Sequence, residues 1–174
     1  MKSMRDINVF GALALLVADE ILRAASAQAP EVGPAASALA LLCHEPGLSI
    51  RTLAAGVALS HAGAVRLVDR LVAEGLVERR GHESDGRTRL LHLTAAGKVA
   101  SMAVLQARTT ALTRALDVLS DYEVAMLGAL SGRMLRSLLS NEEHAYRVCR
   151  LCDYSSCDSC PVDDELVSRK AARA

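Results

Sequence analysis

Four of the five cysteines of this chain lie within twelve residues, near its C-terminal end. They form the pattern C-x2-C-x4-C-x2-C, made by Cys149, Cys152, Cys157 and Cys160. Thiolates bind soft metals and are also the reactive form in redox chemistry, so this density of cysteines indicates metal binding or thiol redox chemistry. The fifth cysteine, Cys43, stands alone and is expected to be a buried, small hydrophobic residue.

Three interpretations of the cysteine motif stay open. Two C-x2-C pairs satisfy tetrahedral zinc, although the four-residue spacer is shorter than in the usual zinc ribbon. The last three cysteines also have the C-x4-C-x2-C spacing of plant-type ferredoxin ligands, and a Cys-Pro ending such as Cys160-Pro161 occurs in bacterial ferredoxins. A metal-free thiol–disulfide switch is the third interpretation. The expected cofactor is therefore zinc or an iron–sulfur cluster, and the spacing does not decide between them.

Arginines form a second group, in residues 60–94. Guanidinium groups bind phosphate oxygens and the O6/N7 edge of guanine, so a cluster of them indicates contact with nucleic acid. Asp85 precedes Arg87 by two residues, and its carboxylate can hold that guanidinium extended toward a narrow minor groove. The arginines of this group that we expect to contact DNA are Arg66, Arg70, Arg80, Arg87 and Arg89.

The segment that carries these arginines predicts a helix followed by a β-hairpin. Ser60 is a suitable N-cap, and Ala64, Leu67, Val68 and Leu71 follow with the spacing of one buried helix face. The helix is expected to end near Gly75. Two short strands are predicted over residues 76–80 and 89–93, joined by a polar turn that contains glycine. A helix followed at once by a basic hairpin is a winged helix.

This segment resembles the DNA-binding core of the MarR family of bacterial transcriptional regulators. The family pattern S-x-x-x-V-x-R-x-V-D-R-L-x-x-x-G-L-V-x-R leads into a wing that ends D-x-R-x-x-x-x-x-L-T. The wing motif is supplied here by residues 85–94, and the resemblance extends in helix order over about residues 5–140. The residues that match the first pattern are Ser60, Arg66, Val68, Asp69, Arg70, Leu71, Gly75, Leu76, Val77 and Arg79.

The resemblance implies that the helix over residues 60–74 enters the major groove of DNA. Small residues stand at positions 62, 63 and 65, where many relatives have serine or threonine, so direct readout is expected to rest on Ser60, His61 and Arg66. For Arg70, a surface ion pair with Asp69 or Glu74 is the competing interpretation.

A shorter helix is predicted just before this one. Residues 49–55 form it and residues 56–59 form the turn, which together complete a helix-turn-helix. Arg51 and Thr52 lie near the start of the short helix, where side chains and free backbone amides can hold a phosphate. A solvated surface arginine is the alternative for Arg51.

Long helices are predicted on both sides of the winged helix. Residues 4–28 form an amphipathic first helix whose charged residues exclude a membrane span or a signal peptide. Thr94 caps a helix that runs to about residue 119, and Ser120 forms a capping box with Glu123 at the start of the next. The resemblance implies that these helices pair with those of a second subunit and place two recognition helices about one DNA turn apart on a pseudo-palindromic operator.

The expected fold class is mainly α, an α+β winged helix flanked by dimerisation helices. We expect an N-terminal dimerisation helix in residues 1–32 and a winged helix-turn-helix lobe in residues 33–94. C-terminal dimerisation helices follow in residues 95–147, and a cysteine-rich tail in residues 148–174. A chain of 174 residues, 51% of them hydrophobic, is long enough to bury one good core.

The composition of the chain excludes several classes of function. The formal net charge is zero, so contact with nucleic acid must come from a local basic patch, and the 2% aromatic content argues against single-strand binding by base stacking. The five histidines are scattered, with no nucleophile set beside them, and no glycine loop of the phosphate-binding type is present. The sequence therefore predicts a cytoplasmic protein that is not an enzyme.

The predicted function is a dimeric regulator that binds double-stranded DNA sequence-specifically, with repression the expected mode. An effector, a metal or a redox change at the cysteine tail is expected to control it, and a small-molecule effector is a further expected partner. Two alternatives stay open. One is an iron–sulfur redox protein, and the other is a winged helix used for protein contacts, with a structural zinc.

Overall fold

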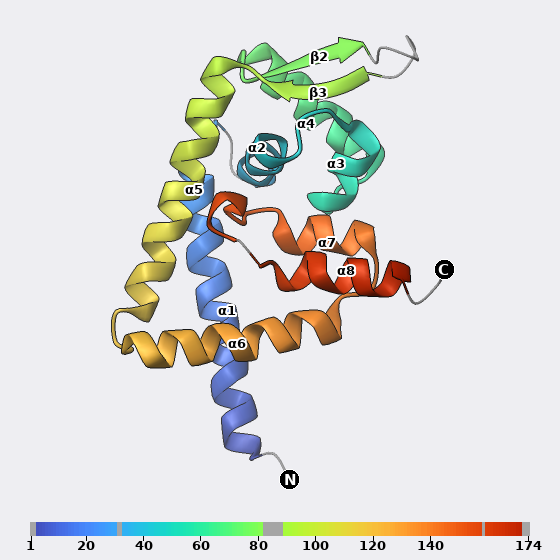
Figure 1. Ribbon diagram of the computed structural model, residues 1–174. Helices are drawn as coiled ribbons and strands as arrows, with labels where there is room; N and C mark the ends of the chain where they lie inside the picture. Colours follow the sequence, from blue (N-terminus) through green and yellow to red (C-terminus); the bar gives the residue numbers. More distant parts are fainter. Residues whose placement is uncertain (1–2, 31–32, 82–88, 158, 172–174) are drawn as a thin grey trace.

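The computed structural model describes residues 3–30, 33–81, 89–157 and 159–171. Helices dominate, and three short strands form one antiparallel sheet (Figure 1). The predicted fold class, mainly α with an α+β winged helix, is confirmed. In chain order the elements are α1 (Met4–Ser26), α2 (Ala35–His44), β1 (Leu48–Ser49), α3 (Ile50–Gly56), α4 (His61–Ala73), β2 (Val77–Gly81), β3 (Arg89–Leu93), α5 (Ala95–Leu116), α6 (Asp121–Leu138), α7 (Glu142–Cys149), the 3-10 helix η1 (Tyr154–Ser156) and α8 (Pro161–Ala171).

The winged helix forms as predicted, with one addition. Helices α3 and α4 make the helix-turn-helix, and β2 pairs with β3 in a register that sets Val77 opposite Leu93. Residues 48 and 49 form β1, which pairs with the other edge of β3, so the strand order is β1-β3-β2. The prediction that Ser49 belongs to the helix is therefore wrong. Ser49 is the N-cap of α3, because its side chain accepts the backbone N–H of Thr52.

Helix α2 lies at the centre of the fold and is buried on all sides over residues 35–42. One face, with Leu39, Leu41 and Leu42, joins the core of the winged helix. The opposite face, with Ala36 and Ala40, packs in a second core with residues of α1 and α5. One helix thus connects the winged helix to the long helices.

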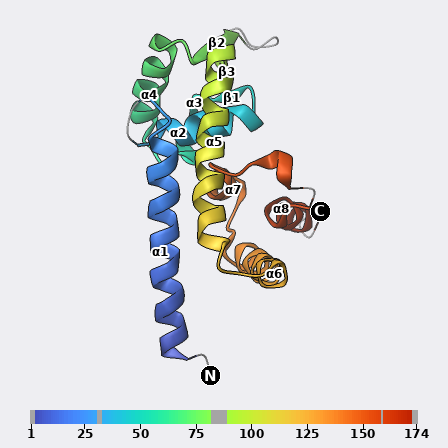
Figure 2. The same ribbon diagram turned by 90° about the vertical axis from the view of Figure 1, so that its left-hand side faces the viewer.

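The long helices form the stem of the molecule. Figure 2 shows α1 and α5 side by side, with α6 at the lower end of α5 and the N-terminal part of α1 extending beyond it. The predicted capping box of α6 is confirmed, since Ser120 and Glu123 exchange both hydrogen bonds. Among the described helices, none is both long enough and apolar enough to cross a membrane.

The C-terminal residues, predicted to be a tail, form helices α7 and α8, which pack against the rest of the fold. Helix α7 packs against α3, and Tyr146 of α7 lies so close to Gly56 that a Cβ there would be 3.3 Å from its Cβ. Helix α8 packs against α6, where Arg136 donates a hydrogen bond of 2.8 Å to Asp164. Residues 142–171 therefore bridge the winged helix and α6, as Figure 1 shows.

Helix α5 begins directly against the turn that ends α4. Thr94 caps α5 by accepting the N–H of Gly97 at 3.0 Å, and its hydroxyl donates to the carbonyl of Gly75 at 2.6 Å. A Cβ at Gly97 would lie 2.0 Å from the carbonyl oxygen of Leu76. The close approach that fixes α5 to the winged helix therefore requires glycine at this position.

The variant Gly97→Ala is expected to lower the free energy of unfolding by about 1–3 kcal/mol or more, because backbone must move to admit the methyl group. Urea denaturation followed by circular dichroism measures this change. In the control Gly128→Ala of α6 the new Cβ meets nothing within 4 Å. The control should be neutral or stabilising by up to about 1 kcal/mol. Equal stability of the two variants would contradict the contact at Leu76.

Candidate nucleic-acid interface

Helix α4 has one buried face and one exposed face. Ser60 caps the helix by accepting the N–H of Gly63 at 3.1 Å, which supports the first turn. The predicted apolar face is confirmed, since all four of its residues are buried in the core. The side chains on the other face are exposed and were predicted to contact DNA: Ser60, His61, Arg66 and Arg70.

The wing is tied to α4 by an ion pair that the sequence analysis did not predict. Arg79 of β2 donates a hydrogen bond of 2.6 Å to the carboxylate of Asp69 on α4. Both residues belong to the matched pattern, but a separation of ten positions gave no local signal for the pair. Because Asp69 bonds to Arg79, its carboxylate serves to set the angle between the helix and the hairpin.

The strands of the wing carry two of the predicted arginines. Arg80 and Arg89 are both exposed, near the end of the hairpin that Figure 1 shows at the top of the molecule. The Nε of Arg80 donates to Glu78 at 3.0 Å, so a carboxylate neutralises part of its charge. Asp85 and Arg87, predicted for the tip of the wing, lie outside the described residues.

At the start of α3 the predicted phosphate site is only partly available. Arg51 is exposed, as expected. The N–H of Thr52 donates to Ser49 at 3.1 Å, and the two hydroxyls are 3.0 Å apart. This amide is therefore already bonded, so a phosphate contact here would rest on Arg51.

The segment that carries this surface is similar to known proteins. A family model described as the MarR family matches residues 33–88. Residues 33–88, which include helices α3 and α4 and strand β2, are therefore similar to the MarR family. Over 54 residues it is 44% identical to the HTH-type transcriptional regulator BilQ of Clostridium symbiosum, a match that covers 31% of this chain and 38% of BilQ. The chain thus matches less than half the length of that curated relative.

Solved structures show the same fold beyond residues 33–88. The YusO protein from Bacillus subtilis aligns with 78% of this chain and 99% of its own, at a TM-score of 0.59 and 22% identity. FabT of Streptococcus pneumoniae, solved in complex with DNA, aligns with 58% of this chain and 71% of its own, at a TM-score of 0.51 and 19% identity. At these identities the likeness is one of fold.

Beside the winged helix, three of the four cysteines of the predicted metal site belong to one apolar cluster. Cys149 is buried, Cys152 and Cys160 are half-buried in the same apolar cluster, and Cys157 is exposed. All are free thiols, and no three metal-binding side chains among the described residues are already arranged as ligands. Cys43 is half-buried against the core of the winged helix, close to what was expected.

The two thiols nearest α7 differ in acidity. A hydrogen bond from Cys149, with the charges of Arg108 and Arg150, lowers the pKa of Cys152 to about 7. The same hydrogen bond and burial raise the pKa of Cys149. Cys152 is thus the cysteine of this pair that ionises first, as a metal ligand or a redox-active thiol requires.

The variant Asp69→Asn is expected to lower the free energy of unfolding by less than about 1 kcal/mol, since the ion pair with Arg79 is partly exposed. The two side chains are 55% and 32% exposed. A double-mutant cycle with Arg79→Gln, measured by urea denaturation, should give a coupling of about 0.2–1 kcal/mol. Additive single effects would show that the ion pair does not hold the wing to α4.

Proposed function

We propose that this chain is a transcriptional regulator that binds double-stranded DNA sequence-specifically as a homodimer. The observation that carries the proposal is the exposed face of α4, on which Arg66 and Arg70 lie beside the basic wing. The family model that matches the same segment and the complex of FabT with DNA support it. Repression is the mode we propose, because a dimer that covers an operator blocks access to it.

Few side chains of α4 can read the DNA sequence. An α-helix fits the major groove with its N-terminal turns toward the base edges, which brings Ser60, His61 and Arg66 closest to them. Arg66 can donate two hydrogen bonds to a guanine. The small residues Ala62 and Val65 can contact a thymine methyl group only, so Arg66 carries most of the discrimination.

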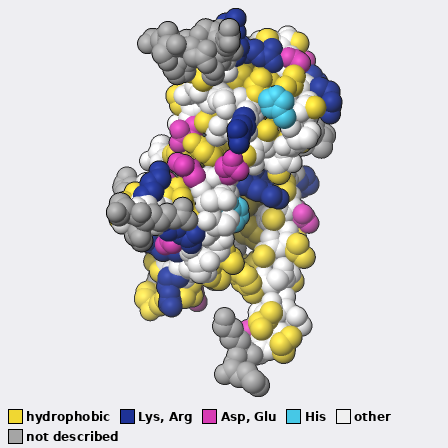
Figure 3. All heavy atoms as spheres, turned by 90° about the vertical axis from the view of Figure 1, so that its right-hand side faces the viewer, with side chains coloured by type: hydrophobic (Ala, Val, Ile, Leu, Met, Phe, Trp, Pro, Cys, Tyr) yellow, Lys and Arg dark blue, Asp and Glu magenta, His cyan; other side chains and the backbone are white. Residues whose placement is uncertain are grey.

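A homodimer accounts for the large apolar surface of the long helices. None of the 18 residues of α6, all of them described, is buried. The accessible surface of the chain is 11166 Å², whereas a compact monomer of this mass exposes about 8,200 Å². Figure 3 shows hydrophobic side chains around the N-terminal part of α1. Large hydrophobic residues that are exposed on α1 and α6 include Ile7, Phe10, Leu13, Leu16, Met126, Leu130 and Leu138.

A small-molecule effector has a place to bind. A cavity of about 630 Å³ lies where the end of α1 meets the start of α2 and the turn after α3. Its walls include Leu22, Val57 and Leu59, with Arg23 and Arg150 among the lining residues. An apolar wall beside Arg150, and beside Arg23, which is already paired with Glu20, suits an apolar acid. Such a ligand would touch both the stem and the winged helix.

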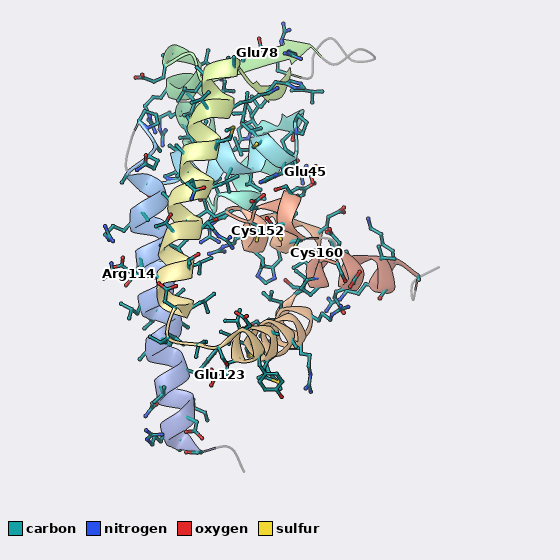
Figure 4. All side chains as sticks on the ribbon, turned by 60° about the vertical axis from the view of Figure 1, so that its left-hand side comes forward. Glu45, Glu78, Arg114, Glu123, Cys152 and Cys160 are labelled. Carbon is teal, nitrogen blue, oxygen red and sulfur yellow. The ribbon has the colours of Figure 1, made fainter. Side chains whose placement is uncertain are left out.

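The variant Arg66→Ala is expected to weaken operator binding by about 1–3 kcal/mol and to relax discrimination between bases, because it removes a base contact. Fluorescence anisotropy at several salt concentrations, on matched and mismatched duplexes, measures both effects. Arg114→Ala is the control, since Figure 4 shows Arg114 far along α5 from the wing residue Glu78. A change in affinity and salt slope alone would make Arg66 a phosphate contact. Unchanged binding would contradict the proposed interface.

The double variant Phe10→Glu/Leu13→Glu is expected to dissociate the homodimer, because it places charges on the exposed apolar face of α1. Sedimentation velocity of the wild type and the variant measures this. The control is Val167→Glu on α8, where the side chain is 67% exposed. A wild type that sediments as a monomer, or a variant that stays dimeric, would contradict the proposed interface.

A further inference from the structure

The four cysteines are brought together by the ends of two helices. Cys149 ends α7, and Cys152 follows it in the next turn. Cys160 immediately precedes Pro161, the first residue of α8. Figure 4 shows Cys152 and Cys160 in the same part of the fold, below the winged helix. The two C-x2-C pairs thus meet between α7 and α8.

The two cysteines of each pair lie near one another. Cys152 acts on the pKa of Cys149, and Cys160 acts on the pKa of Cys157, which places the thiols of each pair close together. Two sulfurs on one edge of a zinc tetrahedron are about 3.8 Å apart, given a Zn–S bond of about 2.3 Å, and the two cysteines of a C-x2-C pair can reach this separation. Cys149, Cys152 and Cys160 belong to one apolar cluster, so the two pairs lie in the same part of the fold, although no three of these described side chains are yet arranged as ligands.

From this geometry we propose that Cys149, Cys152, Cys157 and Cys160 bind one zinc ion as a tetrathiolate. Each thiol gives up its proton to solvent as its sulfur forms the bond to zinc, with no change of oxidation state. Cys157, the exposed member, moves inward to complete the tetrahedron. A [2Fe–2S] cluster takes one pair on each of two irons and so needs the two pairs further apart than a single zinc ion does, whereas three of the four cysteines lie in one apolar cluster.

Two arginines lie beside the proposed complex. Four thiolates and one zinc ion carry a net charge of −2. Arg108 on α5 and Arg150 at the end of α7 line the same small pocket as Cys152. Asp153 and Asp163 act on the thiols with the opposite sign, so the two arginines offset part of the charge of the complex.

The proposed zinc site lies directly against the winged helix. Tyr154, between the second and third cysteines, stacks on His44 at the end of α2, with ring centroids 4.4 Å apart and ring planes 8° apart. The backbone of Cys152 and the carboxylate of Asp153 also lie near enough to His44 to act on its pKa. Leu151 packs in the same core as the inner face of α2. Zinc bound to Cys152 and Cys157 would therefore also restrain Tyr154, which lies between them and packs against the end of α2.

The same site reaches α6 through α8. Arg136 bonds to Asp164, and Pro161 lies 3.6 Å from the position of a Cβ on Gly132. Zinc would thus hold α6 and the winged helix in one arrangement. That this arrangement affects DNA rests on the proposed function, whereas the metal site and its contact with α2 do not.

The test uses the full-length chain, purified in reducing buffer and titrated with zinc chloride. Metal analysis should give about one zinc per chain, and cobalt(II) in its place should show the visible absorption of a tetrahedral thiolate site. Cys157→Ser and Cys160→Ser should each lose the cobalt spectrum, while the matched control Cys43→Ser keeps it. Cys157 is exposed, so its variant should fold.

Hydrogen exchange, measured without DNA, tests the contact with α2. Zinc should slow exchange at the end of α2 by at least about fivefold, the lower range of coupling between sites. Tyr154→Ala should keep the zinc but lose this protection. Neither result depends on operator binding, so failure here leaves the proposed function standing.

Three outcomes would overturn the proposal. The first is iron and sulfide in the anaerobically purified protein, which would replace zinc by a cluster. The second is zinc binding that survives in both Cys157→Ser and Cys160→Ser. The third is equal protection of α2 with and without zinc, which would show that zinc affects the C-terminal helices alone.

Discussion

The structure depends on the burial of helix α2 on all its sides. Alanines at positions 35, 36, 38 and 40 let neighbouring helices approach closely, and Leu39, Leu41 and Leu42 fill the space toward the wing. Close packing of this kind transmits displacement, because a buried helix cannot shift without moving its neighbours. The position of the winged helix relative to α1 and α5 is therefore set by α2.

This constraint connects the proposed functions. In a homodimer built on α1 and α6, the distance between two α4 helices would follow from how α2 joins each lobe to its stem. The proposed effector cavity lies at the start of α2, and the cysteines reach its end through His44 and Tyr154. Both sites would act on the same helix, and each ligand would change DNA affinity only as far as it favours one position of that helix.

Much of the DNA-binding surface could be predicted because its signals are local. The cap at Ser60, the apolar face of α4, the two strands of the wing and the capping box at Ser120 each depend on residues a few positions apart. The resemblance to the MarR family was confirmed by the match over residues 33–88. Mainly α architecture followed from the same patterns.

The features that sequence analysis missed depend on contacts between distant residues. Strand β1 exists because Leu48 pairs with Leu91, and no pattern within two residues predicts it. The ion pair between Asp69 and Arg79 and the stacking of Tyr154 on His44 likewise form only after folding. Helices α7 and α8 were not predicted because the cysteines between them dominate the pattern of that segment. The roles of Asp85 and Arg87, and the identity of the metal, stay predictions.

The central claim, that two copies of this chain read a symmetric operator through α4, is tested most directly by selection of bound duplexes from a random pool. The protein should enrich an inverted repeat whose half-sites are centred about one helical turn, roughly 10 base pairs, apart. Enrichment of single half-sites, of asymmetric sequences or of no sequence at all would contradict it.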